Sequence, residues 1–519
     1  MPWLKALMKA SAYPHPTGKI EHLHTHISDV FLTGKFAYKV KKAVDLKFLD
    51  FSSLEKRKFF CEREVALNRR LAQDIYLGVV PITVDNGAVR VGGKGEVIEY
   101  AVKMVQFDQK GLLNAVAKRG ELTADHMRTL AGQLAGFHRS ALCDEGYGHP
   151  RVVGEHVLGN FKQTEKYRGI VVERDRFDRL REFSEMFLEE HTAGFEERMH
   201  RGAIRICHGD LHLRNICLDR DRLIIFDCIE FNEALSHIDV ISEAAFLMMD
   251  LDHRGLHGLG NVFFNTYLDE TQDYPGLSVL DFYLIYRAMV RAKVAVISLD
   301  DPDMNKKEKR EAGNRAGAYF ELAHRYLMTH DPRLIIMAGV SGSGKSTVAQ
   351  DLSRAENAVV IRSDVLRKHI AGIELDTRAG GQGGYEEGIY THEMTERTYA
   401  GLLKAAEAVV ESGRWAILDA TFGNSDLRRA ALEWAEKKEI PFTIIHCSAP
   451  VPELESRLVG REARGVDASD AGVAVMRRQL STFDPIEPFE ETFTLTLHTE
   501  QGWDAKRIAR KVRKPHSHV

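Results

Sequence analysis

The sequence predicts two large domains, the second of which is an α/β domain with a parallel sheet. At about 150 residues per domain, a chain of 519 residues allows two large domains or three smaller ones. An apolar run at 334–338, a glycine-rich loop and a helical pattern at 347–352 follow one another, which is the strand–loop–helix order of α/β domains. Helical apolar spacing ends just before this strand. We therefore expect domains at 1–329 and 330–519.

Composition indicates a globular protein without an overall basic surface. Hydrophobic residues make up 44% and charged residues 28%, enough for more than one core, and the net charge of −4 argues against a dedicated nucleic-acid binder. The six cysteines show no CxxC spacing, which favours reduced thiols. We find no signal peptide and no apolar run of the roughly 18 residues that a membrane span needs. The expectation is a cytoplasmic protein without a membrane partner, whose oligomeric state stays open.

The strongest chemical signal is GVSGSGKS at 339–346, which fits the phosphate-binding pattern GxxxxGK[ST] at each fixed position. Backbone N–H groups of such a loop and of the following helix point at one place and wrap a polyphosphate. Lys345 would reach the β- and γ-phosphates of ATP, and Ser346 would bind Mg²⁺. The alternative is a tight Gly/Ser turn that happens to contain a lysine. We assign to nucleotide binding Gly339, Ser341, Gly342, Ser343, Gly344, Lys345, Ser346 and Thr347.

Two aspartates stand at the ends of apolar strands that follow this loop. Asp364 ends the run 358–364, where its carboxylate would accept a proton from an acceptor hydroxyl, and Arg367 three residues later would hold an anionic substrate. Asp419 ends the run 415–419 and is a candidate partner of Mg²⁺ or of water. A lone aspartate at a strand end is more often a cap or turn residue. Two of them after a phosphate loop favour function.

Arg457, Arg461 and Arg464 share one face of a predicted helix and would close over the phosphates, where we assign Arg457 and Arg461 to catalysis. A solvated basic stripe is the alternative. Together these features resemble the small P-loop kinases that phosphorylate hydroxyls, such as gluconate kinase, polynucleotide 5′-kinase and zeta-toxin-like kinases. The resemblance implies a base at Asp364 and a lid near 457–464. It does not identify the acceptor.

The segment 373–397 is the expected acceptor site. Its five glycines between 380 and 388 suit a loop that orders on substrate binding, and its edge offers polar and aromatic contacts. An exposed loop followed by a helix is the alternative. The contact residues we single out are Tyr385, Tyr390, Glu393 and Arg397.

The first half carries a second constellation, HGDLHLRN at 208–215 followed by an apolar strand that ends in Asp227. Asp210 would orient the acceptor hydroxyl and take its proton, while Asn215 and Asp227 hold magnesium against the nucleotide.

This pattern resembles the aminoglycoside phosphotransferase family over roughly residues 20–325. The resemblance implies an α+β, bilobal, protein-kinase-like domain. It also implies that Lys39 is the third-strand lysine and that Glu64, or alternatively Glu62, is its ion-pair partner. Asp239 fits an aspartate that in this family buttresses the catalytic loop, so we give it a structural role.

Two departures from protein kinases bear on the first half. The region 25–34 lacks their repeated glycines, and Cys228-Ile229-Glu230-Phe231 follows Asp227 in place of Phe-Gly. The alternative for this half is a kinase-like fold without turnover.

Alternating histidines at 22, 24 and 26 would share one face of a strand and suggest zinc. We see no acidic or cysteine ligand beside them, and a closed zinc site needs four ligands, so surface or core histidines are the better interpretation. His253 and His257 lack the glutamate of HExxH, and the basic tail at 506–514 is typical of a solvated helix end.

The sequence as a whole predicts a fusion of two ATP- and Mg²⁺-dependent kinase domains acting on a small-molecule hydroxyl, and it resembles uncharacterised bacterial fusion proteins of this arrangement. A nucleotide-gated regulatory protein and a nucleic-acid 5′-end kinase are the two alternatives. Neither the acceptor nor a preference for ATP over GTP can be assigned.

Overall fold

The chain forms two compact units. The computed structural model describes residues 2–46, 49–302, 304–327, 331–375, 391–464 and 472–514, without the side chains of Pro2, Ala463 and Arg464. The first unit comprises Met1–Asp250 and Tyr283–Phe320, and the second comprises Leu251–Phe282 and Glu321–Val519. The two-domain architecture is thus confirmed. Residues 251–282, which precede the boundary that we place at residue 330, pack with the second unit.

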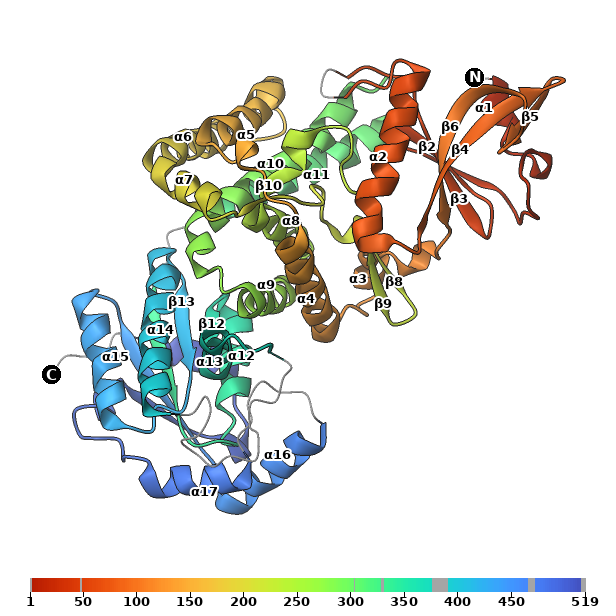
Figure 1. Cartoon of the computed structure of the whole chain (residues 1–519). Helices are drawn as coiled ribbons and strands as arrows, with labels where there is room; N and C mark the ends of the chain where they lie inside the picture. The colour runs from red at the N-terminus through yellow and green to blue at the C-terminus, as the bar shows by residue number, and fades with distance from the viewer. Residues whose placement is uncertain are drawn as a thin grey trace. The chain divides into compact units, whose positions relative to one another are not determined.

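The first unit begins with a six-stranded antiparallel sheet in the order β1-β2-β3-β6-β4-β5 (Figure 1). One face packs against helix α2 through Cys61, Val65 and Val102, while the N-terminal segment covers Phe31 and Tyr38 on the other face. Side chains alternate between the two faces along each strand, so each face presents its own apolar side chains to the segment that covers it. The elements are β1 (Glu21–His24), β2 (Ser28–Leu32), β3 (Phe36–Lys41), α2 (Leu54–Ala72), β4 (Tyr76–Asp85), β5 (Ala88–Val91) and β6 (Glu96–Val105).

The rest of the first unit is mainly helical, which confirms the predicted α+β bilobal class. Two short antiparallel pairs, β7 with β10 and β8 with β9, flank the HGDLHLRN segment. The strands are β7 (Ile204–Ile206), β8 (Ile216–Asp219), β9 (Arg222–Ile225) and β10 (His237–Asp239). The helices include α3 (Leu113–Lys118), α4 (Ala124–Ser140), α5 (Pro150–Thr164), α6 (Arg174–Glu190), α7 (Thr192–His200), α8 (Val240–His253), α10 (Leu280–Ile297) and α11 (Lys306–Arg325).

The second unit is built on a five-stranded sheet in the order β12-β13-β11-β14-β15 (Figure 1). All its strand pairs are parallel, which confirms the predicted parallel sheet. Its central strands β11 and β13 are buried along their whole length because helices cover both faces of the sheet. The strands are β11 (Arg333–Ala338), β12 (Val359–Arg362), β13 (Trp415–Asp419), β14 (Phe442–Ser448) and β15 (Thr494–His498). The helices include α12 (Lys345–Glu356), α13 (Ser363–Ala371), α14 (His392–Glu411), α15 (Ser425–Lys437), α16 (Val451–Arg464), α17 (Val473–Thr482) and α18 (Ala505–Val512).

Helix α9 (His257–Thr271) covers the β12 edge of this parallel sheet. The Asn265 side chain accepts a hydrogen bond from the Val360 N–H at 2.7 Å and donates to the Ala358 carbonyl at 3.1 Å. Asn261 donates to the same carbonyl at 2.9 Å. An edge strand has unpaired backbone groups that need partners, and these two asparagines supply them. The second unit therefore includes a helix from well before the predicted boundary.

All six cysteines are free, and Cys143 is the exposed one. Of the helices in the described parts of the chain, none is long and apolar enough to cross a membrane.

Candidate functional site

The phosphate loop joins β11 to α12, and its backbone conformation depends on glycine. Gly339, Gly342 and Gly344 have φ of +138°, +82° and +88°. A Cβ on Gly339 would lie 2.3 Å from the Cys447 carbonyl oxygen, so no other residue fits there. Among the described residues the buried Ser343 hydroxyl has no hydrogen-bond partner. A glycine cradle with an unsatisfied hydroxyl, leading into a helix N-terminus, fits a polyphosphate.

Lys345 and Ser346 open helix α12 and meet the end of β13. Lys345 Nζ donates to the Val340 carbonyl at 2.9 Å. Burial lowers the pKa of Lys345, an effect that the nearby Asp419 carboxylate opposes. Burial raises the pKa of Asp419, against the opposing influence of Arg362 and of a hydrogen bond from the Ser346 hydroxyl. Hydroxyl and carboxylate oxygens are the ligands that Mg²⁺ prefers, so Ser346 and Asp419 form a donor set suited to it.

Asp364 lies in the first turn of α13, because β12 ends at Arg362 and not at Asp364 as predicted. Arg362 stands opposite Asp419, so Asp364 still follows the same end of the parallel strands. Its charge acts on both neighbours, raising the pKa of Lys345 and that of Asp419. Arg367, one helical turn further along α13, is buried, and its Nη1 donates to Thr395 Oγ1 on α14 at 3.3 Å. The structure thus brings Asp364 to the phosphate loop. Arg367 links α13 to α14 through this hydrogen bond. Substrate binding by Arg367 stays a prediction.

Arg457 is tied to the phosphate loop by direct hydrogen bonds. Its Nη1 donates to the Gly342 carbonyl at 3.3 Å and to Thr499 Oγ1 at 2.8 Å. Thr499 in turn donates to the Ser343 carbonyl at 2.9 Å. Sequence analysis missed Thr499 because it belongs to no motif. Arg461 lies close enough for its charge to lower the pKa of Lys345.

Part of the predicted lid and acceptor region lies outside the described residues. This applies to Tyr385, Tyr390 and the Arg464 side chain. Glu393 and Arg397 are exposed on α14. The lid and the acceptor contacts stay predictions.

A carboxylate from α9 approaches the same strand ends. Asp269 Oδ2 lies 3.8 Å from Arg362 Nη1, and Arg362 pairs with Asp419 in the register of β12 with β13. Burial raises the pKa of Asp269 to about 7, and the Asp419 charge adds to this effect. Sequence analysis missed Asp269, for which the chain offers no motif.

In the first unit, Lys39 lies between two carboxylates. Its Nζ is 2.9 Å from Glu64 Oε1 and 2.5 Å from Asp227 Oδ1. Glu62 instead lies 3.8 Å from Lys58 on the exposed side of α2, so of the two predicted partners it is Glu64 that lies beside Lys39. Asp227 has φ of +68°, a left-handed conformation that strains a non-glycine residue and that clusters at functional sites.

Lys41 extends this arrangement and was missed by sequence analysis. It is fully buried, 2.7 Å from Glu64 Oε2, and is also paired with Glu230. Burial would lower the pKa of Lys39 and Lys41, but the surrounding carboxylates hold both above their usual values. Burial would likewise raise the pKa of Glu64 and Asp227, but the lysines hold both below their usual values. These four groups are therefore ionised.

The catalytic-loop residues lie together. Asn215 Nδ2 donates to the Asp210 backbone oxygen at 3.0 Å and to Asp210 Oδ2 at 3.1 Å. His212 Nε2 lies 3.4 Å from Asp210 Oδ2. The carboxylate of Asp210 is thus oriented by its own loop.

The direct support for this loop comes from Glu243 and from Asp250, which accepts a hydrogen bond from the Leu213 N–H at 3.0 Å, and not from Asp239. Glu243 accepts hydrogen bonds from the backbone N–H groups of His208 at 3.2 Å and Gly209 at 2.7 Å. Its Oε2 also lies 2.8 Å from His138 Nε2. Asp239 is buried and accepts two hydrogen bonds from Arg198, from Nε at 2.5 Å and from Nη2 at 2.7 Å. The predicted structural role of Asp239 is seen, but its contact is with a helix. Sequence analysis missed Glu243, which lies one helical turn later.

Two family models match the chain, the "Phosphotransferase enzyme family" over residues 60–280 and an "AAA domain" over residues 334–486. The chain is 30% identical over 468 residues to an uncharacterized protein of Mycobacterium tuberculosis, a match that covers 90% of this chain and 91% of the relative.

Solved structures also match. A choline/ethanolamine kinase family protein from Mesorhizobium loti is 13% identical over 63% of this chain and 99% of its own, with a TM-score of 0.35. A gluconokinase from Sinorhizobium meliloti is 20% identical over 35% of this chain and 90% of its own, with a TM-score of 0.25.

Proposed function

We propose a function for this chain on the basis of its family: the chain belongs to the two-domain proteins that join a phosphotransferase-family domain to a P-loop kinase domain. The proposed reaction is transfer of the γ-phosphoryl group of Mg-ATP to a hydroxyl of a small molecule. One observation carries the proposal. Lys345, Ser346, Asp419 and Asp364 converge on a single glycine cradle, although they come from the end of one strand and the first turns of two helices. Positioning and electrostatic stabilisation supply nearly all of phosphoryl-transfer catalysis, and these residues supply both.

In the second unit each group has a distinct task. The loop N–H groups and Lys345 bind the phosphates, while the oxygens of Ser346 and Asp419 would hold Mg²⁺. Asp364 takes the proton of the acceptor hydroxyl while the hydroxyl oxygen bonds to the γ-phosphorus of ATP. The bond between the γ-phosphorus and the oxygen that it shares with the β-phosphate breaks at the same time. Arg457 positions the loop through the Gly342 carbonyl.

The first unit offers a second candidate site for the same chemistry. Asp210 would orient the acceptor hydroxyl, Asn215 and Asp227 would hold Mg²⁺, and Lys39 would bind phosphate. The hydrogen bonds from Asn215 to Asp210 support this proposal because they join the metal-binding amide to the base.

The test uses the full chain with labelled ATP, Mg²⁺ and a panel of sugars, aminoglycosides, nucleosides and oligonucleotides. Asp364→Asn should leave ATP affinity within a few-fold and lower transfer from the second site by roughly 100-fold or more, which is the scale of general-base contributions. Asp426→Asn changes an exposed aspartate in the first turn of α15 and serves as the matched control.

The first site is assayed in the Lys345→Ala background, which silences the phosphate loop. There Asp210→Asn should abolish transfer and spare nucleotide binding. Transfer rates equal to those of the parent in both aspartate variants would refute the assignment. Labelling of oligonucleotides alone would favour the nucleic-acid 5′-end kinase instead.

A further inference from the structure

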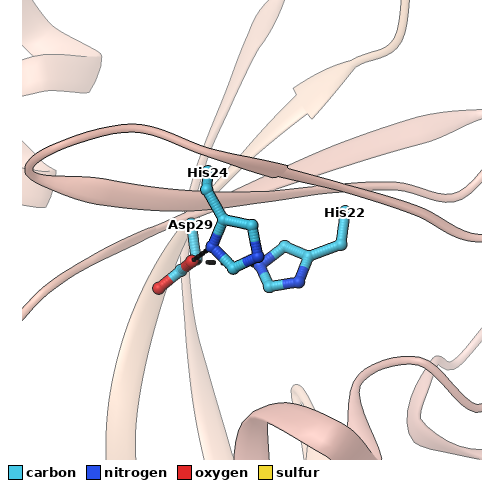
Figure 2. Close-up of side chains that lie close together, drawn as sticks. All are labelled: His22, His24 and Asp29. Carbon is cyan, nitrogen blue, oxygen red and sulfur yellow. Dashed lines mark hydrogen bonds and ion pairs between the residues drawn. The ribbon is translucent and has the colours of Figure 1, made fainter. Parts of the chain in front are cut away.

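The hairpin of β1 and β2 carries a cluster of potential metal ligands that the phosphotransfer sites do not use. His22 and His24 alternate on β1, so their side chains share a face of the sheet. In the antiparallel register Asp29 on β2 stands opposite His24, which places its carboxylate on that same face. Figure 2 shows the two imidazoles and the carboxylate directed toward one another.

The distances suit a small cation after a slight expansion. Asp29 Oδ1 is 3.0 Å from His22 Nε2 and 2.7 Å from His24 Nδ1, and one ligand atom from each residue lies within 4.8 Å of the others. Zinc–ligand bonds of about 2.0–2.1 Å place tetrahedral ligands about 3.3 Å apart, so each histidine needs to move a few tenths of an ångström away from the Asp29 oxygen. The His24 side chain is 66% exposed and can make this movement without disturbing the core.

Burial and charge favour a cation at this place. Asp29 is only 5% exposed, and of the ion pairs within the described residues those of Asp29 involve only His22 and His24. A buried carboxylate needs a compensating charge. The His22 ring stacks on buried Phe31, with centroids 4.4 Å apart and planes at 11°, which fixes the orientation of one ligand.

We propose that His22, His24 and Asp29 bind a divalent transition-metal cation of the zinc class. Two imidazoles and a carboxylate form the three-ligand set of an open zinc site, and water on the exposed side of His24 supplies the fourth ligand. The acidic ligand that the alternating histidines lack in the sequence is therefore present, across the turn of the hairpin. Because β1 is the edge strand, the cation would fasten it to β2.

The proposed site is separate from the magnesium site that we propose in the first unit. Asp29 stands opposite Val40, whereas the neighbouring Val30 stands opposite Lys39, so Asp29 and Lys39 project from opposite faces of the sheet. A second cluster, His138, Cys207 and Glu243, also has ligand spacing. Its members are buried, and Glu243 already accepts two backbone N–H groups of the catalytic loop, so it is the weaker candidate.

The test is Co²⁺ and Zn²⁺ binding by the full chain after chelator treatment, in excess Mg²⁺ to occupy the magnesium sites. The parent should show the intense visible bands of four-coordinate Co²⁺. His24→Ala should lose them and bind Zn²⁺ at least about 100-fold more weakly, since even outer-shell partners contribute about 10–100-fold to metal affinity. His26→Ala, an exposed histidine in the turn of the same hairpin, is the matched control and should bind like the parent.

Asp29→Asn provides a second variant. It should weaken Zn²⁺ binding as His24→Ala does, while circular dichroism shows that both variants stay folded. Unchanged Zn²⁺ affinity and Co²⁺ spectrum in folded His24→Ala would overturn the proposal. So would a parent that shows no four-coordinate Co²⁺ bands.

Discussion

The two candidate sites differ in how their buried charges are balanced. In the first unit, Lys39 and Lys41 lie directly against Glu64, Asp227 and Glu230, and the pairing holds the lysine pKa values up and those of Glu64 and Asp227 down. In the second unit the pKa shifts of Lys345 and Asp419 have the opposite signs to these, although burial also raises the pKa of Glu230 in the first unit. Burial lowers the pKa of Lys345 and raises those of Asp419 and Asp269.

This difference shows that burial alone does not determine a charge state. Lys345 donates to a backbone carbonyl and Lys41 to carboxylates, so only Lys41 gains a full opposing charge. In the first unit the protein fixes the charges itself. In the second unit a bound Mg-nucleotide would bring the opposing charges, with its anion at Lys345 and its cation at Asp419.

The largest expected effect comes from breaking the ionic network of the first unit. Lys41→Met should lower the free energy of unfolding by about 3–5 kcal/mol, because it leaves Glu64 and Glu230 as buried carboxylates with too few cations. Lys345→Met is the matched control and should change stability by less than about 1 kcal/mol, since it separates no ion pair. Calorimetry of the full chain measures both. Equal losses in the two variants would remove the contrast between the sites.

A smaller effect on stability should come from Asp269, a carboxyl of the second unit whose pKa burial raises strongly. Its pKa is about 7 in the folded chain and ordinarily 3.8, a difference of about 3 units. Between these pH values the unfolded chain has lost the proton and the folded chain keeps it, so stability falls as pH rises and levels off above pH 7. Asp269→Asn should remove this loss and gain about 2–4 kcal/mol over the parent at neutral pH.

Urea unfolding from pH 4.5 to 8 checks this prediction. Tryptophan fluorescence suits it because Trp415, Trp434 and Trp503 all lie in the second unit. The advantage of the variant should grow up to about pH 7 and then stay constant. Asp426→Asn, which changes an aspartate at an exposed position, is the matched control. A constant advantage for Asp269→Asn at every pH would contradict the raised pKa.

Sequence alone predicts those parts of the sites whose chemistry depends on local backbone. The phosphate loop follows from its glycines, because a Cβ at Gly339 would collide with Cys447. The HGDLHLRN loop follows from the fixed spacing of Asp210 and Asn215. In both cases a short stretch of chain determines the geometry, so a motif suffices.

Residues that act across long sequence separations carry no such signal. Lys41 lies two residues after Lys39, and what distinguishes it from other lysines is its contact with two carboxylates, Glu64 and Glu230, which are 23 and 189 residues away. Asp269 reaches Arg362 and Asn265 reaches Val360 because α9 packs on the edge of the parallel sheet. Asp29 joins the histidines through strand register. Periodicity shows which face a residue occupies, but not which segment covers that face.

The smallest predicted effect compares how pH affects magnesium-dependent nucleotide binding at the two sites. A metal-binding carboxylate must be deprotonated, and the pKa of Asp419 is raised whereas that of Asp227 is lowered. As pH falls, Asp419 should protonate before Asp227. The second site should then lose more of its affinity for Mg-ATP than the first.

Each site is measured alone by silencing the other, with Asp227→Ala for the second site and Lys345→Ala for the first. Protonation of ATP itself weakens both sites equally, so the ratio of the two affinities isolates the protein groups. In the Asp227→Ala background, Asp419→Asn should bind Mg-ATP more weakly and lose the extra pH dependence, because it removes the titrating carboxyl. If isothermal titration gives parallel declines at the two sites, the opposite charge balance of the units does not govern metal binding. The contrast would then be confined to stability.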